Sequence, residues 1–198
     1  MSRVTNKDAA DVLFNVATIL ELAEDNPYRV RAYRRAARLL LGTRDDVRLK
    51  LTPEHELDLP GLGPRLRKKL GELLSSGHMR FYVELCADLP GEASALMQIP
   101  SVGPKTALRL NEELGLTSAA DVYAAAQQGK IRQLYGFGPK RERQLLEGAE
   151  EVLAGRPKVY APIPFPTTDE LPAEEAAEAP HLSVVKPAHE QLALPEAA

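Results

Sequence analysis

Hydrophobic residues recur every three or four positions through most of residues 6–154, which is the spacing of one buried helix face. The first such segment begins after cap-forming residues at Thr5 and Asp8 and continues to about Glu24. No stretch alternates β-branched with polar residues, so the sequence predicts an all-α fold. The same spacing, bounded by glycine and proline, predicts further helices over residues 27–41, 64–76, 79–87, 92–98, 104–114, 118–127 and 139–154.

Three of these helices begin with one short pattern. A hydrophobic residue stands between two small residues, and proline and a basic residue follow. Glycine permits the tight turn, and proline suits the first helical position, where no N–H is needed. The pattern therefore predicts three helical hairpins. The copies are LPGLGPRLRKKL at residues 59–70, PSVGPKTALRL at residues 100–110 and YGFGPKRERQL at residues 135–145.

The copies differ at two positions. Ser101 replaces the first glycine of the second copy, and serine tolerates a positive φ less well than glycine. Four residues past the second glycine, the second copy has the small Ala107, but the others have Arg67 and Glu142. We therefore expect close helix packing at this position in the second copy alone.

A glycine turn that leads into a helix is suited to holding an anion. The first N–H groups of a helix have no partner within it, and the helix dipole adds positive charge there. A phosphate can approach those donors, and a basic residue past the proline can contact it too. Such contacts read no base sequence. The alternative is an ordinary, well-capped helical corner. The candidate phosphate contacts are Gly61, Gly63, Arg65, Lys68, Gly103, Lys105, Arg109, Gly136, Gly138 and Lys140.

The predicted helix over residues 27–41 is the most basic stretch of the chain. Five arginines lie between Arg29 and Arg38 with no acidic residue among them. This run favours an anionic partner over a solvated face of snorkelling side chains.

Charge is unevenly distributed along the 198 residues. The formal net charge is −3, but residues 157–198 carry two basic and seven acidic residues, which leaves residues 1–156 at +2. That terminal segment also holds eight of the sixteen prolines, so we predict a disordered tail, with a protein-docking motif within residues 182–186 or 192–194. We expect three parts: a helical domain over residues 1–88, a tandem-hairpin domain over 89–156, and the tail.

The one cysteine excludes an internal disulfide, and the polar start of the chain does not resemble a signal peptide. No aliphatic run is long enough to span a bilayer. We expect a cytoplasmic, nucleoid-associated protein without a membrane partner.

These segments together resemble the amino-terminal part of family X DNA polymerases, and the bacterial members in particular. The resemblance rests on NPYRVRAYRRAARLL at residues 26–40, followed by LPGLGPRLRKKLGELLSSG and IPSVGPKTALRL, and it extends over nearly all of residues 6–153. It implies a small helical domain that binds the 5′-phosphate of gapped DNA, and a second domain of helix-hairpin-helix motifs that grips duplex DNA. It also implies a monovalent cation held by backbone carbonyls of the hairpins.

The resemblance implies roles for individual residues. Tyr33 and Arg34 match the motif that lines the pocket of members with lyase activity, and Arg35 extends the same basic helix. Arg29 matches a basic residue that faces the 5′-phosphate. Lys69 matches the amine that forms a Schiff base with deoxyribose phosphate.

Lyase chemistry requires an uncharged amine at Lys69. The neighbouring charges of Arg65 and Lys68 favour that form. Glu72, one helical turn away, could instead pair with either lysine and account for these residues without catalysis.

Nucleotide transfer is not expected from this chain alone. It contains no Asp-x-Asp pair to hold magnesium, and its four histidines lack metal-ligand spacing, so no metal site from side chains is predicted.

The sequence therefore predicts a helical bundle with three helix-hairpin-helix motifs, which binds the DNA backbone at gaps, nicks or 5′-phosphate ends. Two alternatives stay open, namely a 5′-deoxyribose-phosphate lyase that uses Lys69 and a helical adaptor that recruits a protein partner through the tail. The chain could also be a fragment of a longer polymerase.

Overall fold

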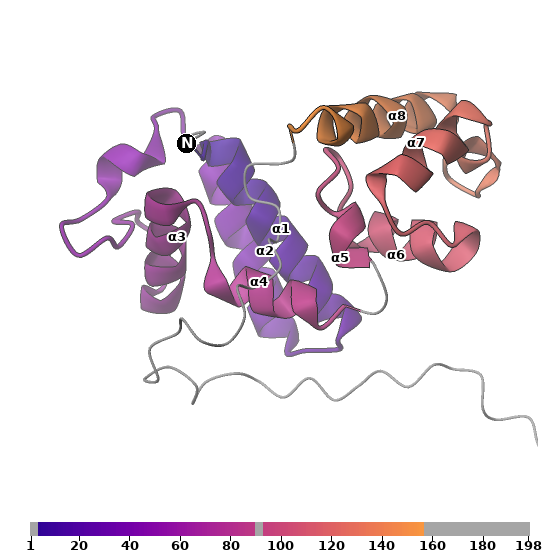
Figure 1. Cartoon of the computed structure of the whole chain (residues 1–198). Coiled ribbons are helices and arrows are strands. Elements are labelled where there is room, and N and C mark those ends of the chain that lie inside the picture. The colour runs from indigo at the N-terminus through magenta and orange to yellow at the C-terminus, as the bar shows by residue number, and fades with distance from the viewer. Residues whose placement is uncertain (1–3, 90–92, 157–198) are drawn as a thin grey trace, which may run out of the picture.

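The computed structural model describes residues 4–89 and 93–156 (Figure 1). These residues form helices without a strand, apart from an isolated bridge between Leu51 and Leu57, so the all-α prediction is confirmed. The predicted disordered tail and its docking motifs lie outside the described residues. The helices are α1 (Asn6–Leu22), α2 (Pro27–Gly42), α3 (Pro64–Ser76), α4 (Arg80–Ala87), α5 (Ala93–Leu96), α6 (Pro104–Leu114), α7 (Ala119–Gln127) and α8 (Pro139–Leu153), with 3₁₀ turns η1 (Val47–Lys50) and η2 (Ile131–Gln133).

Helices α1 and α2 pack against each other along most of their length (Figure 1). Helices α3 and α4 also contact α1, so this pair forms the centre of the first half of the molecule. Their shared face is made of fully buried small and aliphatic side chains, among them Ala9, Leu13, Ala37 and Leu40. Helix α1 ends at Leu22, two residues before the predicted end, because Glu24 adopts a positive φ of 54°.

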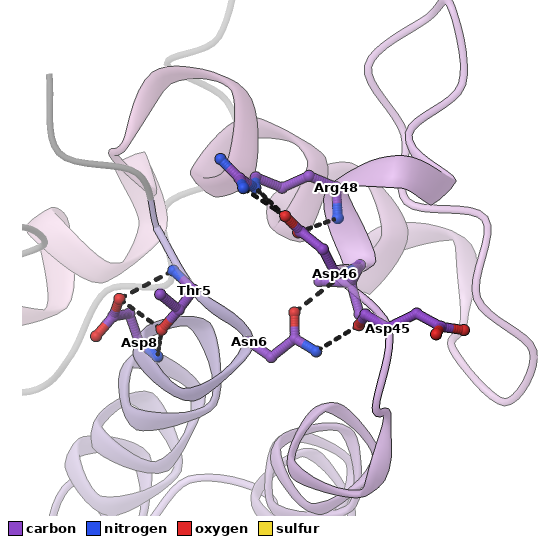
Figure 2. A network of polar contacts seen from close by, with 7 residues as sticks. Thr5, Asn6, Asp8, Asp45, Asp46 and Arg48 are labelled. Carbon is purple, nitrogen blue, oxygen red and sulfur yellow. Dashed lines mark hydrogen bonds and ion pairs between the residues drawn. The ribbon is translucent and has the colours of Figure 1, made fainter.

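The loop after α2 has no hydrophobic period, and one side chain from α1 holds it in place. Asn6 donates through Nδ2 to the carbonyl oxygens of Thr43 (3.0 Å) and Asp45 (2.7 Å), and its Oδ1 accepts from the Val47 N–H (3.0 Å). Figure 2 shows this link beside the cap of α1, where Thr5 and Asp8 bond each other reciprocally. The fold of this polar segment therefore depends on an asparagine about 40 residues away in sequence.

Helix α3 packs against that loop at Gly71. A Cβ at Gly71 would lie 1.7 Å from the carbonyl oxygen of His55, so only glycine allows this approach. Helix α8 comes close to the second hairpin in a similar way, since a Cβ at Gly148 would lie 2.9 Å from the carbonyl oxygen of Pro100.

The second half of the molecule contains α5 to α8, with α7 packed on α8 (Figure 1). The leucines that end the second and third hairpin patterns, Leu110 and Leu145, are fully buried. Helix α5 is shorter than predicted. No helix in residues 4–89 or 93–156 combines the length and apolar character that crossing a membrane requires.

Candidate nucleic-acid interface

The three hairpins share one backbone conformation. The first small residue of each has a positive φ, which is 91° at Gly61, 68° at Ser101 and 79° at Gly136. Ser101 thus takes the glycine conformation despite its side chain. The buried residue that follows (Leu62, Val102 or Phe137) donates its N–H to the carbonyl oxygen three residues earlier. The second glycine is the extended N-cap of a helix with proline in its first turn.

The remaining N–H groups of each turn make no hydrogen bond among the described residues. Within the described residues, the N–H groups of Gly61, Gly63 and Arg65 donate to no acceptor, and the same holds at the matching positions of the other two hairpins. Both glycines are exposed in the first and third hairpins, whereas Gly103 of the second is half-buried. Each turn therefore offers unpaired donors at the positive end of a helix.

The basic residues next to these turns differ in their surroundings. Arg65 and Lys140 are exposed and form no ion pair among the described residues. Lys68 lies 3.8 Å from Glu56, which is a loose surface pair. Arg65 and Lys140 are therefore ready to contact an anion bound at their turns.

The second hairpin faces α1, an arrangement that the sequence did not indicate. Oδ1 of Asn15 lies 3.2 Å from the position of a Cβ at Gly103. Lys105 Nζ lies 3.2 Å from Glu21 Oε2, and the same oxygen accepts from Arg34 Nη2 at 2.8 Å. The hydrogen bonds from Arg34 and Lys105 lower the pKa of Glu21. The structure thus brings these two predicted DNA contacts together, but on a shared carboxylate.

Arg109 and Arg141 connect the second and third hairpins to each other. Arg109 of α6 donates through Nη2 to the Tyr135 carbonyl oxygen (3.0 Å), and its Cζ stands 4.8 Å from the Phe137 ring centroid. Arg141 of α8, which sequence reasoning missed, donates to the Ser101 carbonyl oxygen (2.6 Å). In this arrangement Arg109 supports the third hairpin, a role that the sequence prediction did not include.

Arginines also contact the carbonyls of the first hairpin. Arg35 Nη2 lies 3.3 Å from the Gly61 oxygen, and Arg67 Nε lies 3.2 Å from the Leu62 oxygen. A monovalent cation held by the hairpin carbonyls stays a prediction.

The position expected to lack close packing is well packed in the third hairpin. Glu142 is 4% exposed, and its carboxylate accepts from the backbone N–H of Arg132 (3.0 Å) and from its Nε (2.5 Å). A buried carboxylate there replaces the alanine of the second hairpin, so the expectation of loose packing is wrong for this copy.

Tyr33, Arg29 and Lys69 come together around Phe81, a residue that sequence reasoning did not single out. Arg34, which the resemblance also placed in the lyase pocket, pairs with Glu21 instead. Tyr33 stacks on the Phe81 ring, with centroids 6.0 Å apart and planes 13° from parallel. Lys69 Nζ stands 3.7 Å from the centroid of that ring. Arg29 Cζ lies 5.8 Å from the centroid of the same ring. Arg29 Nη1 forms an ion pair with Asp25 Oδ2 at 2.6 Å. Burial raises the pKa of Tyr33 to about 12, so its hydroxyl is neutral at physiological pH.

The contact found for Glu72 differs from the ion pair with Lys68 or Lys69 that the sequence left open as an alternative. Its Oε1 accepts from the N–H of Arg80 at 3.0 Å, at the start of α4. Glu72 therefore serves as a cap for the next helix.

Comparisons with known proteins agree with this geometry. Residues 4–79, which contain the first hairpin, match the "Helix-hairpin-helix domain" family, and residues 93–151, which contain the other two, match the "SAM-like Helix-hairpin-helix tandem" family. The chain is similar to the amino-terminal part of "DNA polymerase/3'-5' exonuclease PolX" from Bacillus subtilis (strain 168), with 30% identity over 159 residues, or 80% of this chain. The match spans 27% of that protein's length. The resemblance to this amino-terminal region is thus confirmed, and the helix-hairpin-helix domains support DNA binding.

Proposed function

From the two helix-hairpin-helix domains and the similarity to the amino-terminal part of a DNA polymerase, we propose that this chain binds DNA at gaps, nicks or 5′-phosphate ends, as part of DNA repair. The observation that carries the proposal is the row of unpaired N–H groups at each hairpin, with Arg65, Lys105 and Lys140 at the same position past the proline. These groups recognise phosphate oxygens, which every DNA sequence presents alike.

The preference for a 5′-phosphate is assigned to the first half of the molecule. Arg29, Arg34 and Arg35 lie on one basic helix, and Arg35 also contacts the first hairpin. A terminal phosphate carries more charge than an internal one, so a strongly basic helix favours it. Nucleoid association and a protein partner for residues 157–198 remain predictions.

A binding titration tests the proposal. The full chain is titrated with gapped, nicked, single-stranded and intact DNA, each with and without a 5′-phosphate. We expect tightest binding to gapped DNA with a 5′-phosphate, and a salt slope of about −3 if each hairpin releases about one counterion. Equal affinity with and without the phosphate would refute end recognition. No binding to any DNA at low salt would refute DNA binding and favour the adaptor alternative.

Charge reversal at one hairpin locates the contact. Lys140→Glu should weaken binding to all DNA sequences alike, whereas Lys130→Glu, at an exposed lysine outside the hairpins, changes the net charge equally and should have a much smaller effect.

A second candidate function is the removal of 5′-deoxyribose phosphate, favoured by the grouping of Lys69, Arg29 and Tyr33 around Phe81. In this reaction the uncharged amine of Lys69 adds to the aldehyde carbon of the opened sugar. The addition product then loses water, which gives a Schiff base between the lysine and the sugar. Borohydride reduces that bond to a stable amine, so a trapped protein–DNA adduct detects it.

A further inference from the structure

Tyr135 is the most exposed large hydrophobic residue among the described residues, at 93%. It lies in the third hairpin directly before Gly136, where the other two hairpins have Pro60 and Pro100. Exposing a whole aromatic ring to water is unfavourable, so a ring displayed in this way on a DNA-binding element suggests a contact that covers it.

The backbone that carries this ring is held on both sides. Arg109 donates to the Tyr135 carbonyl oxygen at 3.0 Å and is itself held by Glu113 at 2.6 Å. The N–H of Phe137 donates to the Leu134 carbonyl oxygen at 3.0 Å, which closes the turn around Tyr135 and Gly136. The backbone position of Tyr135 is therefore set before any ligand arrives, so little backbone entropy is lost on contact.

The ring stands beside the donors that would hold a phosphate. The N–H groups of Gly136 and Gly138, which follow directly, have no acceptor within the described residues. The exposed Lys140 lies two residues after Gly138 and adds a positive charge to the hairpin. A nucleotide that places its phosphate on these donors has its sugar and base within reach of a neighbouring aromatic side chain. Unpaired amides next to Tyr135 and an exposed lysine in the same hairpin favour a nucleic acid over an apolar protein surface.

We infer that Tyr135 stacks on the face of a base that is exposed at a gap, nick or single-stranded end, so that the third hairpin distinguishes interrupted DNA from intact duplex. The inference rests on the proposed function and adds a residue that selects among DNA structures. Base faces are covered by their neighbours in intact duplex and become available where stacking is interrupted. Stacking on an aromatic ring tolerates any base, which agrees with binding that reads no sequence.

A single tryptophan provides the test, because the chain contains none. Tyr135→Trp should keep the fold, and its fluorescence should be quenched when gapped or single-stranded DNA is added, but much less by intact duplex. Leu49→Trp is the matched control. Leu49 is 83% exposed on η1, in the half of the molecule away from α8 (Figure 1), so its fluorescence should stay nearly constant.

Affinity provides a second, independent measurement. Tyr135→Ala should weaken binding to gapped DNA about tenfold, within the range for loss of one base–aromatic stack, and change binding to intact duplex less than about twofold. Tyr135→Phe keeps the ring and should bind as the wild type does. Thermal melts followed by circular dichroism check that each variant is folded.

The outcomes separate the inference from the proposed function. If the wild-type chain binds no DNA, both fail together. Suppose the wild type binds gapped DNA but the fluorescence of the Tyr135→Trp variant does not change; then the inference alone is wrong. The same holds if Tyr135→Ala weakens binding to gapped and to intact DNA equally. Self-association of the wild type that Tyr135→Ala abolishes would assign the ring to a protein contact and also overturn the inference.

Discussion

Arg141 of α8 donates through Nη2 to the carbonyl oxygen of Ser101 in the second hairpin, over 2.6 Å. In the opposite direction, Arg109 of α6 donates to the carbonyl oxygen of Tyr135 in the third hairpin, over 3.0 Å. Each hairpin of the tandem is therefore held by an arginine that follows the other hairpin. This reciprocal link fixes the separation of two sets of unpaired N–H groups, so one rigid unit can hold two phosphates.

Replacing Arg141 tests this link. Arg141→Met keeps the aliphatic stem but removes the donor, so it should lower the free energy of unfolding by about 1.5–3 kcal/mol, the range for a charged hydrogen bond. It should also weaken DNA binding, because the two hairpins lose their fixed separation. Urea denaturation and a DNA titration measure the two effects. Arg143→Met is the control, since Arg143 is exposed on the same helix; similar losses in both variants would contradict the link.

The positive φ of Ser101 predicts that glycine is preferred there. Ser101→Gly removes left-handed backbone strain of about 1 kcal/mol but gives back part of this gain through a more flexible unfolded chain, so we expect a net stabilisation of about 0.5 kcal/mol. The reciprocal change, Gly136→Ser, places a side chain at φ 79° and should destabilise by about 1 kcal/mol. Thermal unfolding of both variants shows whether each substitution raises or lowers the stability. A loss of stability in Ser101→Gly would mean that the serine side chain compensates for its strain.

Local signals in the sequence predicted most of the helices and all three hairpins. Proline and glycine mark the turns through backbone geometry that is independent of the rest of the fold, which is why Pro64, Pro104 and Pro139 begin helices as predicted. The end of α1 and the shortness of α5 could not be predicted, because tertiary packing decides them.

The side-chain partners of the candidate site were far harder to predict. Lys105 pairs with Glu21, which is 84 residues away in sequence, and Arg141 reaches Ser101 across 40 residues. No period or motif encodes such pairs, since they depend on how two halves of the molecule meet. Glu142 could have been suspected, because a charged residue at a position reserved for a small one requires a partner.

Glu142 should be essential for the third hairpin. Glu142→Ala leaves the N–H of Arg132 without its acceptor and should cost about 2–3 kcal/mol of stability. Glu142→Gln keeps an oxygen for that N–H and should cost about 1 kcal/mol. Chemical denaturation of both variants tests this order. Equal losses would show that charge, and not the hydrogen bond to the backbone, is what the hairpin needs.

Glu21 should weaken DNA binding in the wild-type chain, because its carboxylate occupies Arg34 and Lys105. Glu21→Gln should therefore raise DNA affinity about threefold at low salt, with a smaller gain at high salt as screening increases. Glu112→Gln removes the same charge from an exposed position on α6 and should raise affinity less.

The pKa shift of Glu21 gives the sign of its pH dependence. Because Arg34 and Lys105 lower its pKa, the carboxylate stays ionised above pH 4.5, and its small contribution to stability is lost as the pH falls through the lowered value. The wild-type chain and Glu21→Gln should therefore become more alike in stability under acid conditions. A stability difference between the two proteins that grows below pH 4 would contradict the ion pairs of Glu21 with Arg34 and Lys105.

The contact between Lys69 and Phe81 makes the lyase candidate testable residue by residue. The ring attracts the ammonium form of the lysine, whereas attack on an aldehyde needs the uncharged amine. If the reaction occurs, borohydride should trap an adduct with the wild type and with Lys68→Ala, but not with Lys69→Ala. Lys68 is the matched control, since it is the exposed neighbour on the same helix.

Phe81→Leu separates the ring's effect from the lysine's reactivity. Loss of the cation–π contact should raise the trapping rate about threefold, provided that circular dichroism shows the variant folded. If no adduct forms with the wild type or with Phe81→Leu, the lyase candidate is refuted, and the cluster of Arg29, Tyr33 and Lys69 is left with phosphate binding alone. An adduct that persists in Lys69→Ala would move the reactive amine to another lysine and show that the ring contact has no part in the chemistry.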